Sequence, residues 1–281
     1  MNRTEQAIKA ELFRALHAGP RLLVLPNAWD PISARIVVNA GFRAIATTSG
    51  GVAWAVGYAD GEHAPWDEIV AATHRIARSV SVPVTADIES GYGDTPEAVA
   101  HSISDIIEAG AVGVNLEDGL RSGPTPIRTV DDAVARIRAA RQAATAKGVP
   151  IVINARTDLF IKNIGDEAGR VEAAIARGRA YLAAGADCFY PISLRDTAAM
   201  KTLADALQAP ININVRAGSP GIAELEALGI RRASFATALP LVALGVVRQM
   251  LEQVRATHRF DAVNPALSHP EAQQLFAPPP E

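Results

Sequence analysis

Three acidic residues lie at or near the ends of predicted buried strands, where they could act together. Asp87 and Glu89 are two positions apart in the strand predicted over 83–89, and Glu117 lies near the end of the strand predicted over 112–118. Alternate strand residues point to one face, so Asp87 and Glu89 should share a face. Three carboxylates in a dry site need a compensating cation, and oxygen-only ligands suit Mg2+ or Mn2+. The alternative is that one or two of these acids cap the following helices, with Asp118 a better cap than Glu117.

A cation and a glycine-rich turn complete the candidate site. Arg156 lies at the end of the strand predicted over 151–157. Its guanidinium can bind a carboxylate with two hydrogen bonds, balance the acids in an internal ion pair, or do both. The predicted turn Thr47-Thr48-Ser49-Gly50-Gly51 offers small side chains and free N–H groups that can hold a carboxylate or an enolate oxygen. Asp60 follows in the glycine-rich stretch 56–61, which is either a mobile gate or a polar loop.

The predicted strand ends lack the groups that several other mechanisms need. None of the lysines lies at a strand end, which argues against a Schiff-base aldolase. No histidine lies at a strand end or in a metal-binding spacing, which argues against a zinc hydrolase. Cys188, the one cysteine, begins a predicted strand and is expected to be buried structure rather than a nucleophile.

The elements that position these residues form eight predicted strand–helix units. Strands are predicted at 21–27, 44–48, 83–89, 112–118, 151–157, 188–191, 211–214 and 233–238. Helices are predicted at 31–40, 66–80, 95–109, 130–146, 166–184, 197–207, 221–228 and 240–257. The strands are apolar on both faces, as parallel strands covered by helices must be. The pattern favours an α/β fold of the (β/α)8 TIM-barrel type, whose active site lies at the carboxyl ends of the strands. The alternative, an open doubly wound sheet, is disfavoured because no Gly-x-Gly-x-x-Gly motif follows the first strand.

The composition agrees with one large barrel domain. The chain has 281 residues, about the length of one such barrel and also of two ordinary domains. Its net charge of −3 provides no basic field to attract nucleic acid. No apolar run approaches the roughly 20 residues of a membrane span, so we expect a cytoplasmic protein with no membrane partner. The barrel domain is expected over 1–258, followed by a Pro-rich C-terminal arm over 259–281.

Four motifs resemble those of the isocitrate lyase/phosphoenolpyruvate mutase superfamily. They are Asp87-Ile88-Glu89-Ser90-Gly91-Tyr92-Gly93, Asn115-Leu116-Glu117-Asp118, Asn154-Ala155-Arg156-Thr157-Asp158 and Pro26-Asn27-Ala28-Trp29-Asp30. The resemblance extends from about residue 22 to about residue 255, with the motifs in the family's order and spacing. It implies a Mg2+-dependent enzyme that cleaves or forms a C–C or C–P bond beside a pyruvyl or 2-oxo acid unit through an enolate.

The resemblance also implies roles for individual residues. Asp87 is the implied principal metal ligand, and Glu89 and Glu117 complete the metal shell. Asp60 lies on an implied gating loop. The residues implied to bind the substrate are Thr48, Ser49, Gly50, Gly51, Arg156 and Asn214.

The resemblance further implies a homotetramer, built as a dimer of dimers that exchange the eighth barrel helix. The predicted last helix, 240–257, fits this because it is apolar nearly all round. An exterior barrel helix needs only one apolar stripe.

The segment after Glu117 departs from the lyase pattern. Lyases carry a Cys and a His there, whereas residues 119–126 contain neither. The mutase branch has an Asn-bearing gating segment there and a Trp where this chain has Ala46, and the lyases have a Glu where it has Ile192. We therefore expect a divergent member of the family. The alternatives to a lyase are an oxaloacetate decarboxylase, a phosphonopyruvate-type mutase or hydrolase, and a non-catalytic binding protein on the same fold.

Overall fold

The computed structural model describes residues 2–121 and 125–277, and within them the parallel strands fall into two sheets that together encircle the core as a barrel. The pairing runs in order from β2 (Asn27–Ala28) through β3 (Ile45–Thr47), β4 (Val84–Asp87), β5 (Gly113–Glu117) and β6 (Val152–Thr157) to β7 (Cys188–Pro191). A parallel bridge between Phe189 and Ile211 continues the ring toward β8 (Asn212–Asn214) and β9 (Arg232–Ser234). β9 pairs with β1 (Leu23–Leu25), which Pro26 separates from β2. The predicted eight-stranded α/β barrel is confirmed.

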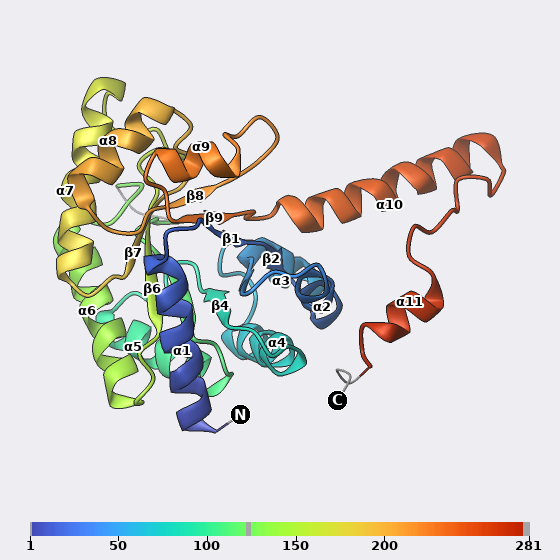
Figure 1. Cartoon of the computed structure of the whole chain (residues 1–281), viewed down its shortest axis with the longest axis horizontal. Coiled ribbons are helices and arrows are strands. Elements are labelled where there is room, and N and C mark those ends of the chain that lie inside the picture. Colours follow the sequence, from blue (N-terminus) through green and yellow to red (C-terminus); the bar gives the residue numbers. More distant parts are fainter. Residues whose placement is uncertain (1, 122–124, 278–281) are drawn as a thin grey trace.

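The helices lie around the outside of the ring, except for α10 and α11, which extend away from it (Figure 1). In chain order they are α1 (Arg3–Ala18), α2 (Pro31–Asn39), α3 (Ser49–Ala55), α4 (Trp66–Ser79), α5 (Pro96–Glu108), α6 (Val130–Ala146), α7 (Glu167–Ala183), α8 (Thr197–Leu207), α9 (Ile222–Ala227), α10 (Ala238–Thr257) and α11 (His269–Gln274). Their limits follow local signals. Asp30 and Thr95 cap α2 and α5, each just before a proline. Gly110 and Gly185 take the left-handed conformation just beyond α5 and α7, which ends those helices.

Three helices, α1, α3 and α11, were missing from the predicted pattern. α1 precedes the first strand, and its Phe13 ring approaches Gly113 at the start of β5, so α1 covers the amino end of the barrel. α3 begins at Ser49, within the run predicted to be a turn, so that prediction was wrong. Glycine disfavours a helix, but a Cβ at Gly51 would lie 2.7 Å from Thr48 Cγ2 and 2.8 Å from Trp29 Cβ. The close packing around Gly51 therefore outweighs the low helix propensity of glycine.

A buried polar cluster links α1 to the barrel interior. Nδ1 of His17 lies 2.8 Å from the carbonyl oxygen of Phe13, and Nε2 lies 3.4 Å from Nη1 of Arg232. Arg232 is fully buried, and its Nη2 donates to Oδ1 of Asn115 at 3.1 Å. Burial and the neighbouring Arg232 lower the pKa of His17 to about 3. His17 is therefore neutral and accepts from Arg232 through Nε2.

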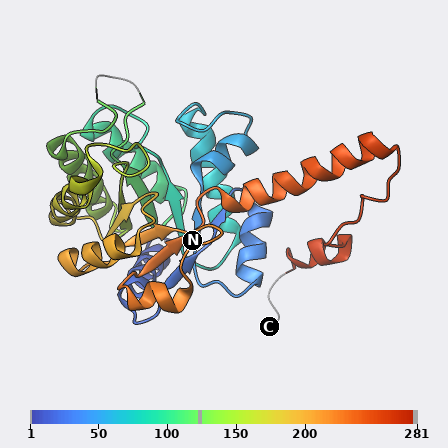
Figure 2. The same cartoon turned by 90° about the horizontal axis from the view of Figure 1, so that it is seen from above.

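α10 projects away from the barrel, and the chain then returns through α11 toward α2 (Figures 1 and 2). Large apolar side chains on α10 are about half to two-thirds exposed: Leu241, Val242, Leu244, Val246, Val247 and Leu251. The returning arm touches the body at Arg35, whose Nη1 donates to the carbonyl oxygen of Leu275 at 2.5 Å and whose guanidinium lies 4.7 Å from the centre of the Phe276 ring. None of the described helices is both long and apolar enough to cross a membrane.

Candidate active site

The predicted site residues gather at the carboxyl ends of the strands. Asp87 ends β4, Glu117 ends β5 and Asn214 ends β8. Arg156 is the last residue but one of β6 and lies in register with Glu117. This is the end of a TIM barrel at which catalytic residues are found.

Arg156 forms an ion pair with Glu117 within the barrel mouth. Its Nη1 is 2.6 Å from Oε2 of Glu117, and its Nε donates to Oδ1 of Asp158 at 2.8 Å. Burial alone would lower the pKa of Arg156, but Glu117 and Asp158 raise it, so the guanidinium stays charged. Burial and the neighbouring acids raise the pKa of Glu117 to about 8 against the effect of Arg156. The 2.6 Å contact itself places the two side chains as an internal pair, and the contacts to Glu117 and Asp158 use Nη1 and Nε of Arg156.

Asp87 has one carboxylate oxygen without a partner. Its Oδ2 accepts from the N–H of Ser49 at 3.2 Å, while its Oδ1 is buried with no hydrogen-bond donor. Burial and the nearby Asp60 raise the pKa of this carboxyl, whereas Arg156 and the Ser49 N–H lower it. An unpaired buried carboxylate oxygen is costly unless a cation or a proton meets it.

Glu89 does not share a strand face with Asp87, contrary to the prediction. β4 ends at Asp87, and Glu89 takes a left-handed conformation with φ of 53° in the turn that follows. Its side chain is nevertheless buried at the mouth, where Oε1 accepts from the N–H of Glu62 at 2.9 Å and Oε2 accepts from Arg121 at 2.6 Å. Burial raises the pKa of Glu89 to about 7, although Arg121 lowers it.

Glu62 is a site residue that the sequence did not reveal. Its Oε1 accepts from the N–H of Ser90 at 2.9 Å, from the hydroxyl of Ser90 at 2.8 Å and from the N–H of Tyr92 at 3.2 Å. Glu62, Glu89 and Tyr92 all have left-handed φ angles, between 52° and 55°. Such backbone strain needs strong neighbouring contacts to persist, and here these contacts fasten the Asp60 segment to the turn after β4.

The first turn of α3 takes the place of the predicted Gly-Gly turn beside the acids. The first N–H groups of a helix have no partner within the helix, and the one on Ser49 points at Asp87. Gly50 is packed closely, because a Cβ there would lie 3.1 Å from both Asp60 Oδ2 and Thr237 Cγ2. The turn was the wrong element, but the expected N–H donors and the close approach of Asp60 are both present.

Asp118 is not a helix cap. It is buried and accepts from the N–H of Asp158 at 2.8 Å and from the hydroxyl of Tyr181 at 2.7 Å, whereas Thr129 caps α6. Asp158 in turn accepts from Nε of Arg156, so Asp118 supports the Arg156 guanidinium through Asp158.

Two further residues line the β7 and β8 side of the mouth. Oδ1 of Asn214 accepts from the N–H of Ser193 at 2.9 Å, which fixes the amide orientation. Tyr190 is buried, and burial raises its pKa to about 12 although Arg156 lowers it. Residues 119–126 form the segment that differs from the lyase pattern. Three of them, Ser122, Gly123 and Pro124, lie outside the described residues.

The donor set fits a divalent cation through Asp87 first. Within residues 2–121 and 125–277, no three His, Cys, Asp or Glu side chains are grouped as a complete metal-binding cluster. Glu89 is paired with Arg121, and Glu117 is paired with Arg156. The Oδ1 of Asp87, which has no such partner, is therefore the oxygen that could bind a metal directly. Glu89 and Glu117 suit contacts to the metal through water molecules, because Mg2+ commonly keeps several of its bound waters.

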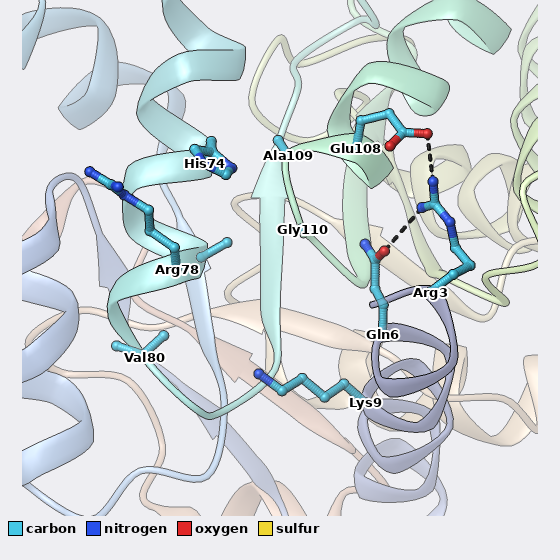
Figure 3. Close-up of a pocket in the computed structure, with 10 residues that line it drawn as sticks. Arg3, Gln6, Lys9, His74, Arg78, Val80, Glu108, Ala109 and Gly110 are labelled. Atoms are coloured by element: carbon cyan, nitrogen blue, oxygen red, sulfur yellow. Dashed lines mark hydrogen bonds and ion pairs between the residues drawn. The ribbon is translucent and has the colours of Figure 1, made fainter. Parts of the chain in front are cut away.

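A separate pocket of about 420 Å3 lies at the opposite end of the barrel (Figure 3). Val80 and Gly110, which precede β4 and β5, line it, and Lys9 and His74 reach toward it from α1 and α4. Its Arg3 is already paired with Glu108 at 2.5 Å. Cations beside the last turns of α4 and α5 are explained by the negative ends of those helices, so this pocket does not compete with the acidic mouth as the active site.

The family comparison agrees with this geometry. The phosphoenolpyruvate phosphomutase family model matches residues 13–255. The chain belongs to this family. It is similar to 2-methylisocitrate lyase of Escherichia coli K12, with 33% identity over 72% of this chain and 68% of that protein. It is 28% identical to oxaloacetate decarboxylase of Pseudomonas aeruginosa LESB58 over 99% of this chain and 97% of that protein. A Burkholderia cenocepacia J2315 structure, provisionally assigned as a lyase or mutase, has 36% identity and a TM-score of 0.91 over 98% of each chain.

Membership confirms the resemblance found in the motifs and makes the chain an enzyme of the isocitrate lyase/phosphoenolpyruvate mutase type. Members of this superfamily are lyases and mutases that act on 2-oxo acids. Family membership therefore supports an enzyme rather than a non-catalytic binding protein.

Proposed function

We propose that this enzyme uses Mg2+ to cleave or form a bond beside the pyruvyl unit of a 2-oxo acid, through an enolate. The observation that carries the proposal is the buried, unpaired Oδ1 of Asp87 in a mouth that also presents the charged Arg156. An anionic 2-oxo acid together with a divalent cation would neutralise both groups. A bound Mg2+ supplies a Lewis acid that stabilises negative charge on the 2-oxo oxygen.

The residues of the chain bind and orient the substrate. Arg156, fixed by Glu117 and Asp158, presents its remaining N–H groups to the substrate carboxylate. The amino end of α3 offers backbone N–H donors to an oxygen that gains negative charge. Asn214 ends β8 at the mouth, and because its Oδ1 accepts from the Ser193 N–H, its amide N–H2 group is the part that would donate to the substrate.

The proton supply favours substrates that release an unprotonated fragment. A lyase-type cleavage needs a proton shuttle for the departing partner, and neither a Cys nor a His is present in residues 119–126. Burial raises the pKa of Tyr190 to about 12, which makes it a poor acid–base group near neutral pH. Decarboxylation of a 2-oxo dicarboxylic acid avoids this requirement because CO2 leaves unprotonated, so oxaloacetate decarboxylation is the second candidate function.

Steady-state assays test the proposal directly. Oxaloacetate, phosphonopyruvate and 2-methylisocitrate are incubated with the enzyme and Mg2+, and products are followed by NMR. We expect turnover of at least one 2-oxo acid that stops with EDTA and returns with Mg2+. Binding of Mg2+ and oxalate without turnover of any member of the panel would contradict the proposal and favour a binding protein.

We further propose that the enzyme is a homotetramer whose subunits exchange α10 within each dimer. The support is the row of exposed apolar side chains on α10, which packs against little of its own barrel (Figure 2). A helix of this kind needs a second surface to cover it, and a two-fold axis would supply the same helix from a second copy.

A further inference from the structure

The guanidinium of Arg121 lies among three carboxylates at the barrel mouth. Its Nη2 is 2.6 Å from Oε2 of Glu89 and 3.9 Å from Oε1 of Glu117, and its Nε is 3.6 Å from Oε2 of Glu62. Burial alone would lower the pKa of Arg121, but these three acids raise it. Its charge is therefore already balanced, so Arg121 is not a free binding group for a substrate anion.

The surrounding chain is shaped to admit this guanidinium. Gly61 has φ of 109°, and a Cβ there would lie 2.7 Å from Nη1 of Arg121. The base of the segment that carries Arg121 is held separately, because Lys162 donates to the carbonyl oxygens of Leu120 at 2.8 Å and Pro126 at 2.9 Å. The arginine can thus change partners as a side chain while the base of its segment stays in place.

Arg121 and a divalent cation would compete for the carboxylates of Glu89 and Glu117. Both carboxylate oxygens of Glu89 have donors, Oε1 from the Glu62 N–H at 2.9 Å and Oε2 from Arg121 at 2.6 Å. A cation bound at Asp87 and drawing on Glu89 and Glu117 would lie close to a fixed positive charge. In a partly buried site of low effective dielectric, two like charges repel strongly.

We propose that Arg121 is a displaceable internal cation, which balances Glu89 and Glu117 when no metal is bound and gives them up when one binds. The inference rests on the metal site proposed above. Glu62 provides the place to which Arg121 withdraws, because its Oε1 is held by Ser90 and Tyr92 while its Oε2 faces Arg121. Metal binding is thereby coupled to the position of the Arg121 side chain, which follows directly on Leu120, the residue held by Lys162.

Metal affinity gives a test that does not depend on catalysis. Mn2+ binding is measured by the loss of the free-ion EPR signal for the wild type, Arg121→Gln, Arg121→Lys and Arg216→Gln. Removing the competing charge in Arg121→Gln should tighten Mn2+ binding by about 10-fold, which is the smallest change typical of residues next to a metal shell but in the opposite direction, because Arg121 opposes the metal rather than supporting its ligands. Arg121→Lys keeps the charge and should bind like the wild type. Arg216→Gln removes an exposed arginine from the same end of the barrel and controls for net charge.

A second readout follows the arginine itself. Modification of Arg121 by hydroxyphenylglyoxal, mapped by mass spectrometry, should become faster when Mg2+ is added. Unchanged or weaker Mn2+ binding by folded Arg121→Gln overturns the proposal, as does slower modification with Mg2+. When either overturning result is accompanied by Mn2+ binding in the wild type and its loss in Asp87→Ala, the metal site stands and only the role of Arg121 fails. If the wild type binds no Mn2+, the metal site itself fails.

Discussion

Arg156 and Glu117 are in-register neighbours on β6 and β5, and their side chains meet at 2.6 Å in the barrel mouth. Sequence alone left open whether Arg156 binds substrate or balances the acids, and this pairing shows that it balances Glu117. The same contact, together with that to Asp158, fixes the orientation of the guanidinium.

Replacing Arg156 should harm both folding and binding. Arg156→Gln leaves Glu117 and Asp158 without their cation, and breaking a buried ion pair in this way costs about 3–5 kcal/mol of unfolding free energy. Urea denaturation measures this cost. Arg156→Lys keeps the charge but loses the two-pronged geometry, so it should lose less stability and still bind oxalate more weakly than the wild type. Equal stability of Arg156→Gln and the wild type would refute the role of the pair.

Replacing Asp87 should abolish Mg2+-dependent turnover without unfolding the protein. Asp87→Ala removes a proposed ligand whose Oδ1 has no protein partner, so little native bonding is lost. Removing a desolvated carboxyl should leave the melting temperature equal or higher. Activity is assayed with Mg2+, metal binding by calorimetry and stability by thermal melting. Wild-type Mg2+ affinity in this variant would rule out the assignment.

The stability of the fold should fall in mild acid because of His17. Its folded-state pKa of about 3 lies below its ordinary value of 6.5, so the unfolded chain binds this proton first as the pH falls. The contribution is complete above pH 6.5 and is lost progressively toward pH 3, by at most about 1.4 kcal/mol per pH unit. Chemical denaturation of His17→Gln over this range should show a shallower pH dependence. An identical pH dependence in the variant would contradict the prediction.

The missing cysteine should slow lyase chemistry. Arg121 stays protonated, and the described hydroxyl of Thr125 is a poor shuttle without a paired base. We expect 2-methylisocitrate and isocitrate to be cleaved at least about 100-fold more slowly than by a cysteine-bearing relative, the low end for loss of one general acid. Steady-state kinetics of the two enzymes side by side measure the ratio. Efficient cleavage would mean that another group, such as Tyr58 or Tyr190, moves the proton.

Assembly should depend on the apolar face of α10. Light scattering at micromolar concentration should give the mass of four chains for the wild type. The double variant Leu244→Asp/Leu251→Asp places charges on exposed apolar positions of α10 and should yield smaller, folded species. Arg248→Glu, on the same helix but polar in the wild type, is the matched control. A monomeric wild type would disprove the proposed tetramer.

The sequence by itself determined the barrel and most of the residues at its mouth. Apolar runs, helix caps and glycines after helices are local signals, and they located the eight units within a few residues of their observed limits. A parallel barrel then brings the ends of its strands together, so Asp87, Glu117 and Arg156 could be placed without coordinates. The motifs identified the family for the same reason, because they occupy those strand ends.

Only the tertiary structure decided how these residues are held. Glu89 follows a strand that ends two residues earlier, in a left-handed turn fastened by Glu62, which lies 27 residues away in the sequence. Asp118 is a buried acceptor for Tyr181 and Asp158 rather than a cap, and α1 closes the barrel through His17 and Arg232. Each of these contacts joins segments that are distant in the chain, and local periodicity contains no information about which distant polar groups will meet once the strands have closed into a ring.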